Sequence, residues 1–276
     1  MASRHSAFYS PLLCSVAALE KDGHEVSYSV LQRGQTGHGV IREGLVDILQ
    51  SAVSSYWQAR ERGVSNLPVH FAQINRRDGF FLVGRHPDSA FEWERLPGST
   101  VLADHGAQPL VMLQYAVRFN SVDWDAVRAL NAGTPEEMAA TFAAGVGDYI
   151  HLQAPILAGE IVASVGASMP PVAFSSLCCA REFQKTEEYR TFLTTYDKVR
   201  PWVHTADPAD VAEAEAGFFP LVPREKLVDA IRRYQALGCW GGGVEIPRDL
   251  YEQALDVFQC ARATNDRHPY EEVCRQ

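Results

Sequence analysis

The chain has 276 residues, of which 46% are hydrophobic and 21% are charged, a composition typical of a globular protein long enough to form two lobes. Its formal net charge of -9 at pH 7 excludes a general nucleic-acid-binding role, because contact with a phosphate backbone requires a basic surface. No apolar run in the sequence approaches the roughly 20 residues that a membrane-spanning helix needs.

Strands and helices alternate in the first part of the chain, and this alternation predicts an α/β fold with a mainly parallel sheet. Ser10 and Pro11 are suited to begin a helix over residues 11–21, as an N-cap and a first-turn proline. We expect further helices at Gly37–Glu43 and Ser54–Arg62, and strands at His5–Tyr9, Glu25–Leu31, Val46–Leu49, Val69–Ile74 and Phe80–Val83.

A second region repeats the alternation, and the end of the chain is mostly helical. Thr134, Pro135 and Glu137 form a favourable helix start, with a hydroxyl cap and early acidic residues. The tail is expected to be helical over residues 185–203, 208–216, 223–237 and 248–262. The strands expected in between are Thr100–Ala103, Ala126–Leu130 and Val172–Cys179, with a helix beginning near Ala107.

Two similar segments stand out in this series. Each has a helix end, a glycine suited to a left-handed cap, and an aspartate that opens a short apolar strand: Gly44–Asp47 in the first and Gly145–Asp148 in the second. Ligands of open α/β sheets bind at the carboxyl ends of strands. Two such units therefore predict two α/β lobes with a ligand cleft between them.

The ordered series of motifs resembles the type II periplasmic-binding-protein fold, in particular the NMT1/THI5-like family of nitrate-, sulfonate- and taurine-type substrate-binding proteins of ABC transporters. The residues that carry the likeness are listed in chain order: Tyr9–Pro11, Gly34–Gly37, Gly44–Ile48, Leu96–Val101, Gly145–Asp148, Phe183–Tyr196 and Tyr234–Trp240. The resemblance implies a two-lobed, hinge-closing binding protein, with one lobe formed by residues 1–84 and 176–276 and the other by residues 85–175. The crossovers are expected near Gly84–Arg85 and Pro170–Ser175.

In this family the ligand lies between helix N-termini of the two lobes, where free backbone N–H groups and hydroxyls bind anionic oxygens. Carried over to this sequence, the resemblance implies two sets of ligand-binding residues. The first lobe supplies Tyr9, Ser10, Gln35, Thr36, Gly37, His38, Ser51, Ser54 and Ser55. The second lobe supplies Asp104, His105, Gly106, Gln108 and Gln153. Ser10 has the alternative role of a plain helix cap, and Trp57 is expected in the core.

Two enzymes on this fold provide alternatives. The pyrimidine synthase of thiamine biosynthesis carries a Lys and a His shortly after the first Gly-x-x-Asp unit, where this chain has Ser51 and Ser54, and its cysteine-rich motif would fall at Met169–Ser176, which has no cysteine. That activity is not expected. The aryl sulfinate desulfinases offer a looser match, with Cys14 as nucleophile and His38 and Arg42 beside it; Cys14 otherwise belongs to the core of its helix.

The sequence favours a binding protein without a cofactor or a metal. None of the six cysteines stands in a C-x-x-C pair, and most are expected to be buried. The expected partner is a small ligand, such as a pyrimidine, a sulfonate or a similar anion, together with an ABC transporter permease, and the expected oligomeric state is a monomer or weak dimer. Met1–Ser6 lacks the apolar segment of a signal peptide, so the expected location is periplasmic after removal of a signal and otherwise cytoplasmic.

Overall fold

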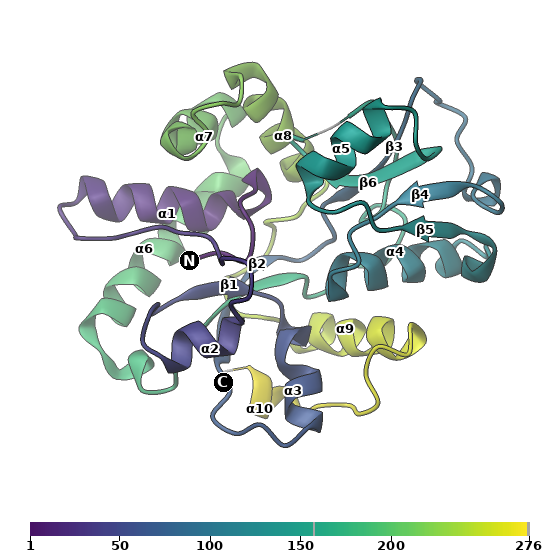
Figure 1. Cartoon of the computed structure of the whole chain (residues 1–276). Coiled ribbons are helices and arrows are strands. Elements are labelled where there is room, and N and C mark those ends of the chain that lie inside the picture. Colours follow the sequence, from purple (N-terminus) through teal and green to yellow (C-terminus); the bar gives the residue numbers. More distant parts are fainter. Residues whose placement is uncertain (157, 275–276) are drawn as a thin grey trace.

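The computed structural model describes residues 1–156 and 158–274 of the chain. Its strands form two separate sheets, one of three strands and one of five, with helices packed around both (Figure 1). The two sheets and their helices form two lobes, and the α/β prediction is confirmed.

The first sheet has the order β1-β8-β2, with β8 antiparallel to both neighbours. All residues of the three strands are buried, which explains why their sequences read as nearly continuous apolar runs. The strand bounds are Leu49–Ser51 (β1), Val69–Asn75 (β2) and Ser175–Cys179 (β8).

The second sheet has the order β5-β4-β6-β3-β7. Strand β4 is parallel to β5 and β6, whereas β3 is antiparallel to β6 and β7. The bounds are Phe80–Gly84 (β3), Thr100–Leu102 (β4), Arg128–Leu130 (β5), Tyr149–Gln153 (β6) and Glu160–Ser164 (β7).

The prediction of a mainly parallel sheet is wrong, because β3 and β8 run against their neighbours. Each of these two strands enters its sheet directly from the other sheet, and no α-helix precedes it to return the chain to its starting edge. A parallel pair requires such a crossover, usually a helix. Strand β7 was not expected from the sequence at all.

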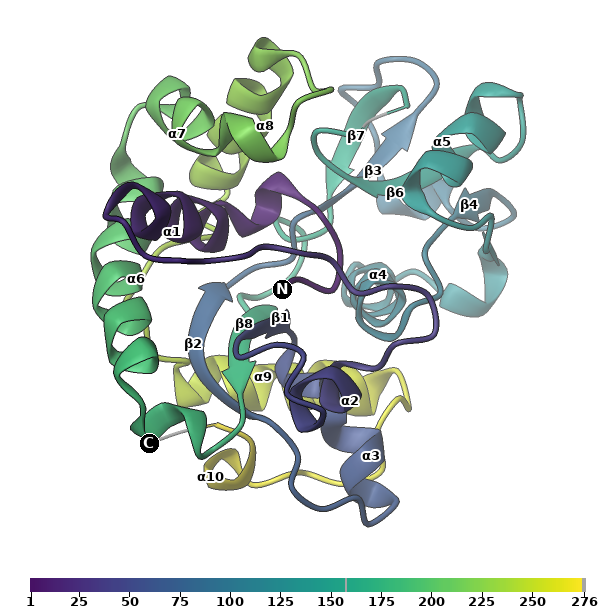
Figure 2. The same cartoon turned by 60° about the vertical axis from the view of Figure 1, so that its left-hand side comes forward.

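Several of the helices pack against one another around the sheets (Figures 1 and 2). Helices α1 and α6 lie side by side, α7 and α8 pack together next to them, and α9 contacts α4 of the second lobe. The α-helix bounds are Ser10–Lys21 (α1), Gly37–Arg42 (α2), Trp57–Glu61 (α3), Ala107–Phe119 (α4), Pro135–Ala143 (α5), Glu187–Thr205 (α6), Pro208–Glu215 (α7), Arg224–Ala236 (α8), Arg248–Cys260 (α9) and Tyr270–Val273 (α10). Short 3₁₀ helices are Ala7–Tyr9 (η1), Val53–Tyr56 (η2), Trp93–Arg95 (η3), Trp124–Ala126 (η4), Phe183–Lys185 (η5) and Ala216–Phe218 (η6).

Two of the expected strands are not strands. The segment His5–Tyr9 contains η1, since the Ser6 hydroxyl accepts the Phe8 N–H and caps a helical turn. The alternating segment Glu25–Leu31 forms no strand, and Val30 makes one isolated bridge, to Ala2. An alternating pattern needs a neighbouring strand to pair with, and this segment has none along its length.

Both Gly-x-x-Asp units form, although the strand expected at Val46–Leu49 begins only at Leu49, two residues after Asp47. Gly44 ends α2 with φ +67°, and Gly145 ends α5 with φ +97°, the left-handed region that glycine adopts at helix ends. Strand β1 follows the first unit and β6 follows the second. Trp57 is 1% exposed, which confirms its expected place in the core.

The chain passes from the first sheet to the second between β2 and β3, and returns between β7 and β8. These two crossovers lie side by side, because Val172 N donates to Arg76 O (3.0 Å) and the Arg77 guanidinium donates to Gly166 O (2.9 Å). Strand β3 (Phe80–Gly84) already pairs within the second sheet, so the first crossover lies before β3 and not at Gly84–Arg85, where it was expected. The lobe boundaries 1–84, 85–175 and 176–276 stay a prediction. Within the described residues, no helix is long and apolar enough to cross a membrane.

Candidate functional site

Two adjoining cavities lie between the lobes. The serine cavity, of about 190 Å³, is lined by residues of both lobes, among them Ser51, Ser54, Ser55, Gly106, Gln108 and Ser175. The glutamine cavity, of about 240 Å³, is lined among others by His5, Ser6, Thr134, Glu136, Gln153 and Pro155. Ser3, Arg4 and Phe80 line both cavities, so the two cavities share one wall.

The loop after β1 forms one side of the serine cavity. Ser51 Oγ donates to Ser55 Oγ (2.8 Å), and the Ala52 N–H donates to the same oxygen (3.1 Å), which closes the loop into the first turn of η2. The Ser55 hydroxyl therefore accepts two hydrogen bonds and keeps its own proton for another acceptor.

Ser54 and Gln108 join the two lobes across this cavity. Ser54 Oγ donates to Gln108 Oε1 (2.6 Å), and Gln108 Nε2 donates to the backbone oxygen of Phe174 (2.7 Å). Gln108 belongs to the first turn of α4, and Ser54 to η2. The pair thus brings together two helix starts that are far apart in the sequence.

Ser3, Tyr9 and Gln50 form the floor of the serine cavity. Gln50 Oε1 accepts from Ser3 Oγ (2.7 Å) and from Ser3 N (3.0 Å). Burial raises the pKa of the Tyr9 hydroxyl, against the opposing effects of Arg4 and of hydrogen bonds with Ser3, Ser175 and Gln50. The phenol therefore stays protonated and uncharged.

Arg4 of the N-terminal segment, which lines both cavities, forms an ion pair with Asp104 after β4. The distance between Arg4 Nη2 and Asp104 Oδ2 is 2.6 Å, and the side chains are 30% and 20% exposed. Burial by itself would raise the pKa of the Asp104 carboxyl, but the Arg4 charge and the Gly106 N–H bond together lower it. Both groups are thus charged at neutral pH.

His151 of β6 lies near this pair, and Gln153 of the same strand lines the glutamine cavity. His151 is fully buried and stacks on Phe80 with ring centroids 4.5 Å apart. Burial lowers the pKa of His151 to about 3, so its ring is neutral. Among the described residues, neither ring nitrogen of His151 nor Gln153 Nε2 has a hydrogen-bond partner. Unpaired buried polar atoms are uncommon in folded proteins, and Gln153 lines the glutamine cavity.

The structure brings several of the expected site residues together. Six of them line the serine cavity: Tyr9, Ser51, Ser54, Ser55, Gly106 and Gln108. Gln153 lines the glutamine cavity, and Asp104 pairs with Arg4, which lines both cavities.

Other expected residues lie elsewhere. Ser10 is buried and donates to Ala7 O, within its own helix start. Gln35 accepts from Gln32 N, and Thr36 caps α2. Gly37 begins α2, where a Cβ would clash with the side chains of Leu49 and Tyr56. His38 packs its ring on Tyr56, and His105 is exposed. None of these side chains lines either cleft cavity, and their role as ligand-binding residues stays a prediction.

Sequence reasoning placed Gln50 within the loop expected to meet the ligand but missed Ser3, Arg4, Phe80 and Ser175. Arg4 had no local signal, since its significance depends on Asp104, which lies 100 positions away. Ser175 begins β8, whereas ligands of open α/β sheets are expected at the carboxyl ends of strands. Because β8 is antiparallel to β1, its amino end lies beside Ser51, and the register pairs Ser51 with Ser176.

The geometry around Cys14 opposes a nucleophilic role. Cys14 is 3% exposed, and its Sγ lies 4.0 Å from both Val211 O and Glu215 Oε2 of α7. Burial, and then the Glu215 charge, raise the pKa of the Cys14 thiol well above its usual value. Arg42 is exposed and pairs with Glu43. The thiol therefore lies in the packed α1–α7 contact.

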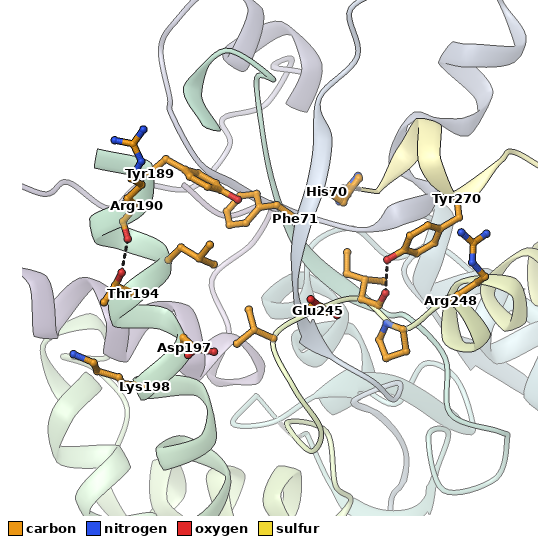
Figure 3. Close-up of a pocket in the computed structure, with 14 residues that line it drawn as sticks. His70, Phe71, Tyr189, Arg190, Thr194, Asp197, Lys198, Glu245, Arg248 and Tyr270 are labelled. Carbon is orange, nitrogen blue, oxygen red and sulfur yellow. Dashed lines mark hydrogen bonds between the residues drawn. The ribbon is translucent and has the colours of Figure 1, made fainter. Parts of the chain in front are cut away.

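A larger cavity of about 980 Å³ lies away from the cleft, and we call it the outer cavity (Figure 3). It lies between α6 and the segment Val244–Arg248, with Phe71 and Tyr270 in its wall. All its lining residues come from β2 or from the chain after β8, so the second sheet contributes nothing to it. Its lining charges are mixed, with Arg190, Lys198 and Arg248 against Asp197 and Glu245.

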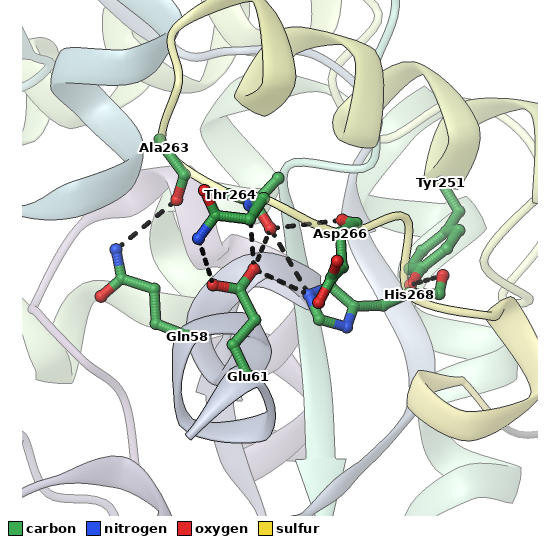
Figure 4. A network of polar contacts seen from close by, with 8 residues as sticks. Gln58, Glu61, Tyr251, Ala263, Thr264, Asp266 and His268 are labelled. Carbon is green, nitrogen blue, oxygen red and sulfur yellow. Dashed lines mark hydrogen bonds and ion pairs between the residues drawn. The ribbon is translucent and has the colours of Figure 1, made fainter. Parts of the chain in front are cut away.

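A polar network anchors α3, the helix that directly follows η2 (Figure 4). Glu61 accepts from Thr264 Oγ1 (2.6 Å), Asn265 N (3.0 Å) and Asn265 Nδ2 (3.2 Å). The Thr264 hydroxyl, together with the neighbouring donors, lowers the pKa of Glu61 to about 2. His268, which pairs with Glu61, stacks on Trp57 at the start of the same helix.

Within residues 1–156 and 158–274, no group of three or more His, Cys, Asp or Glu side chains is placed to hold a metal ion. Five of the six cysteines are buried, as expected, and Cys260 is exposed.

Comparison with known proteins identifies the fold. No family model matches the chain. The sequence is 26% identical, over 249 residues, to "Putative binding protein YtlA" of Bacillus subtilis (strain 168), covering 84% of this chain and 73% of that protein.

Solved structures match the chain over almost its whole length. The ligand-binding component of an ABC-type import system from Staphylococcus aureus has a TM-score of 0.77 at 12% identity, covering 98% of this chain and 93% of the other. The periplasmic aliphatic sulphonate binding protein SsuA from Escherichia coli has a TM-score of 0.70 at 13% identity, covering 97% and 94%.

A Cys-to-Ser mutant of DszB in complex with biphenyl-2-sulfinic acid has a TM-score of 0.66 at 11% identity, covering 100% of this chain and 96% of the other. At these identities the structural matches establish the fold. The predicted type II periplasmic-binding-protein fold is therefore confirmed.

Proposed function

We propose that this chain, which has the fold of the substrate-binding components of ABC-type importers, binds a small organic anion in the cleft between its lobes. The observation that carries the proposal is the serine cavity, where hydroxyl and amide groups of both lobes converge around a space of about 190 Å³. Its relative is named a binding protein, and its structural neighbours include a sulfonate-binding protein.

The serine cavity can bind an anion through hydroxyl and amide hydrogen-bond donors, which carry no charge. Ser55 and Gln108 each keep a proton free, because the Ser55 hydroxyl acts as an acceptor in its two hydrogen bonds and the Gln108 amide uses one of its two N–H groups. Hydrogen bonds to an ionised acceptor are roughly twice as strong as those between neutral groups. Sulfonate and carboxylate oxygens are therefore the ligand chemistry that this cavity would bind most tightly.

Closure is the second part of the proposal. Ser54 and Gln108 bind each other across the cleft, and the two crossovers lie side by side as a double hinge. A ligand that contacts both lobes would favour the closed arrangement, since it binds that state better than the open one.

Thermal-shift screening of the whole chain against sulfonates, sulfinates, carboxylates and pyrimidines tests the proposal. A ligand at a hundredfold excess over its Kd adds about 2.7 kcal/mol to the free energy of unfolding, a rise of several degrees in Tm. Calorimetric titration of the best compound should give one site per chain. If no compound in the four classes raises Tm, the proposal is wrong.

Delivery to an ABC transporter permease and a location outside the cytoplasm are proposed on the same basis, because the E. coli neighbour is a periplasmic protein. Cell fractionation tests the location. Recovery of the native, untagged protein from the cytoplasmic fraction alone would contradict it.

The enzyme alternative rests on the likeness to DszB and makes a distinct prediction. A desulfinase needs an accessible thiolate, whereas the buried thiol of Cys14 has a raised pKa. Labelling of the native protein with a thiol reagent at pH 8 should modify Cys260 at least about a hundredfold faster than Cys14, because buried groups react through local opening. Rapid labelling of Cys14, together with sulfite release that Cys14→Ser abolishes, would favour the enzyme.

A further inference from the structure

Arg4 occupies the boundary between the two cleft cavities. Its side chain lines both of them, and its guanidinium carbon lies 5.9 Å from the centre of the Phe80 ring in their shared wall. Among the described residues that line these cavities, it is the one Lys or Arg. An anion in either cavity therefore lies next to the same positive charge.

Asp104 neutralises that charge in the structure. The two side chains belong to different lobes, and they meet at 2.6 Å with 30% and 20% exposure. An anionic ligand would have to compete with this carboxylate for the guanidinium, which offers five donors and binds carboxylate and sulfonate-like oxygens in a fork.

Asp104 is placed so that it can release Arg4 without being left unpaired. Its second oxygen, Oδ1, accepts the Gly106 N–H at 2.7 Å, at the start of α4. The carboxylate also retains partial contact with solvent. Exchange of one anion for another on Arg4 therefore leaves no buried charge without a partner, which would be the costly outcome.

The glutamine cavity, which Arg4 also lines, supplies a second polar contact for a ligand, from Gln153. Gln153 is 9% exposed, and its Nε2 has no hydrogen-bond partner among the described residues. Each cavity alone is smaller than the about 300–1,000 Å³ of usual small-molecule sites, and the two together reach the lower end of that range. One ligand that spans both would use Gln153 as well as the serine cavity.

We propose that Arg4 recognises the anionic group of an elongated ligand that spans both cavities, and that this group replaces Asp104 as the partner of Arg4. The proposal rests on the proposed function, that the cleft binds an organic anion. Asp104 is then the resting counter-ion of the site, and the interlobe ion pair is exchanged for ligand contacts when the ligand binds.

Calorimetric titration with hexane-1-sulfonate, hexanoate, methanesulfonate and the uncharged hexane-1-sulfonamide tests this exchange. For wild type, at least one hexyl anion should bind at least tenfold more tightly than methanesulfonate. Arg4→Gln should weaken that hexyl anion at least tenfold and leave the sulfonamide within twofold. Asp104→Asn should tighten it several-fold, since the amide still accepts the Gly106 N–H but no longer competes for Arg4.

Matched controls come from the ion pair of Arg95 with Asp88 in the second lobe. Arg95→Gln and Asp88→Asn make the same charge changes away from the cavities and should leave every affinity within twofold. Arg4→Lys keeps the charge and should retain part of the affinity, while binding of the sulfonamide by Arg4→Gln shows that this variant is folded.

The outcomes separate the two proposals. If hexyl anions bind but Arg4→Gln leaves their affinity unchanged, or if Asp104→Asn weakens them, the role of Arg4 is wrong while the proposed function stands. Equal affinities for the hexyl anions and methanesulfonate would overturn the spanning ligand. If neither hexyl anion binds wild type, this inference is wrong, and the proposed function fails only if the wider screen also finds no ligand.

Discussion

The cleft and the outer cavity differ in a way that separates size from function. The outer cavity is about 980 Å³ and the serine cavity about 190 Å³. The large cavity is built within one lobe and has charges of both signs in its wall, whereas the small one brings together hydroxyl and amide groups from both lobes. Convergence of polar groups from separate parts of the fold, rather than volume, marks the site that a ligand can close.

The largest expected effect comes from removing the polar bridge of the cleft. Ser54→Ala combined with Gln108→Leu should weaken binding of the best ligand at least a hundredfold, since the anion loses the free N–H of Gln108 and the closed arrangement loses the hydrogen bond between Ser54 and Gln108, each worth about a factor of ten. Calorimetric titration measures the change. Ser27→Ala with Gln32→Leu makes the same substitutions on an exposed segment and should leave the affinity unaltered; equal losses in both variants would refute the placement of the site.

A smaller effect on ligand binding is expected from the polar network around Glu61, which anchors α3. Glu61→Gln should lower the free energy of unfolding at pH 7 by about 2 kcal/mol, because hydrogen bonds to a charged group are lost. Denaturant unfolding measures this change. The ligand affinity should fall by no more than a few-fold, because Glu61 anchors α3 and does not line the cleft cavities.

The pH dependence of this effect has a definite sign. The pKa of Glu61 is lowered from 4.5 to about 2 in the folded chain, so its contribution is complete above pH 4.5 and is lost as the pH falls toward 2. The stability difference between wild type and Glu61→Gln should therefore shrink below pH 4.5. Glu20→Gln, on the exposed end of α1, serves as the control, and a difference independent of pH would contradict the account.

The smallest effect is expected in the outer cavity. Thr194→Ala removes a hydroxyl from its wall, and since that hydroxyl donates to Arg190 O within α6, the helix should tolerate the loss. Calorimetric affinity for the cleft ligand should stay within twofold of wild type. A tenfold loss would show that the larger cavity takes part in binding.

Local sequence signals predicted the helices and helix caps, because these depend mainly on residues close together in the sequence. Glycines at positions 44 and 145 cap their helices because only a left-handed residue fits there, and the amphipathic tail forms α6, α7, α8 and α9 near the expected bounds. Strand direction depends on which sheet a strand enters, and this is a long-range choice. The predicted directions of β3 and β8 were therefore wrong, and the half-exposed strand β7 was not predicted.

The same distinction applies to the site. The family resemblance implied Ser51, Ser54, Ser55 and Gln108, which lie at helix starts after strands, and the structure brings them together. Ser10 shares that local pattern, but its place inside α1 turns it toward Ala7 and away from the cleft cavities. Arg4 has no pattern of its own, because only the folded chain brings it to Asp104.

A crystal structure of the chain grown with the compound that raises Tm most is the most direct test of the cleft as the binding site. The account predicts density for that compound between the lobes, within hydrogen-bond distance of Ser54 or Gln108 and of Arg4. Density in the outer cavity beside Phe71 and Tyr270, with the cleft unchanged, would contradict it.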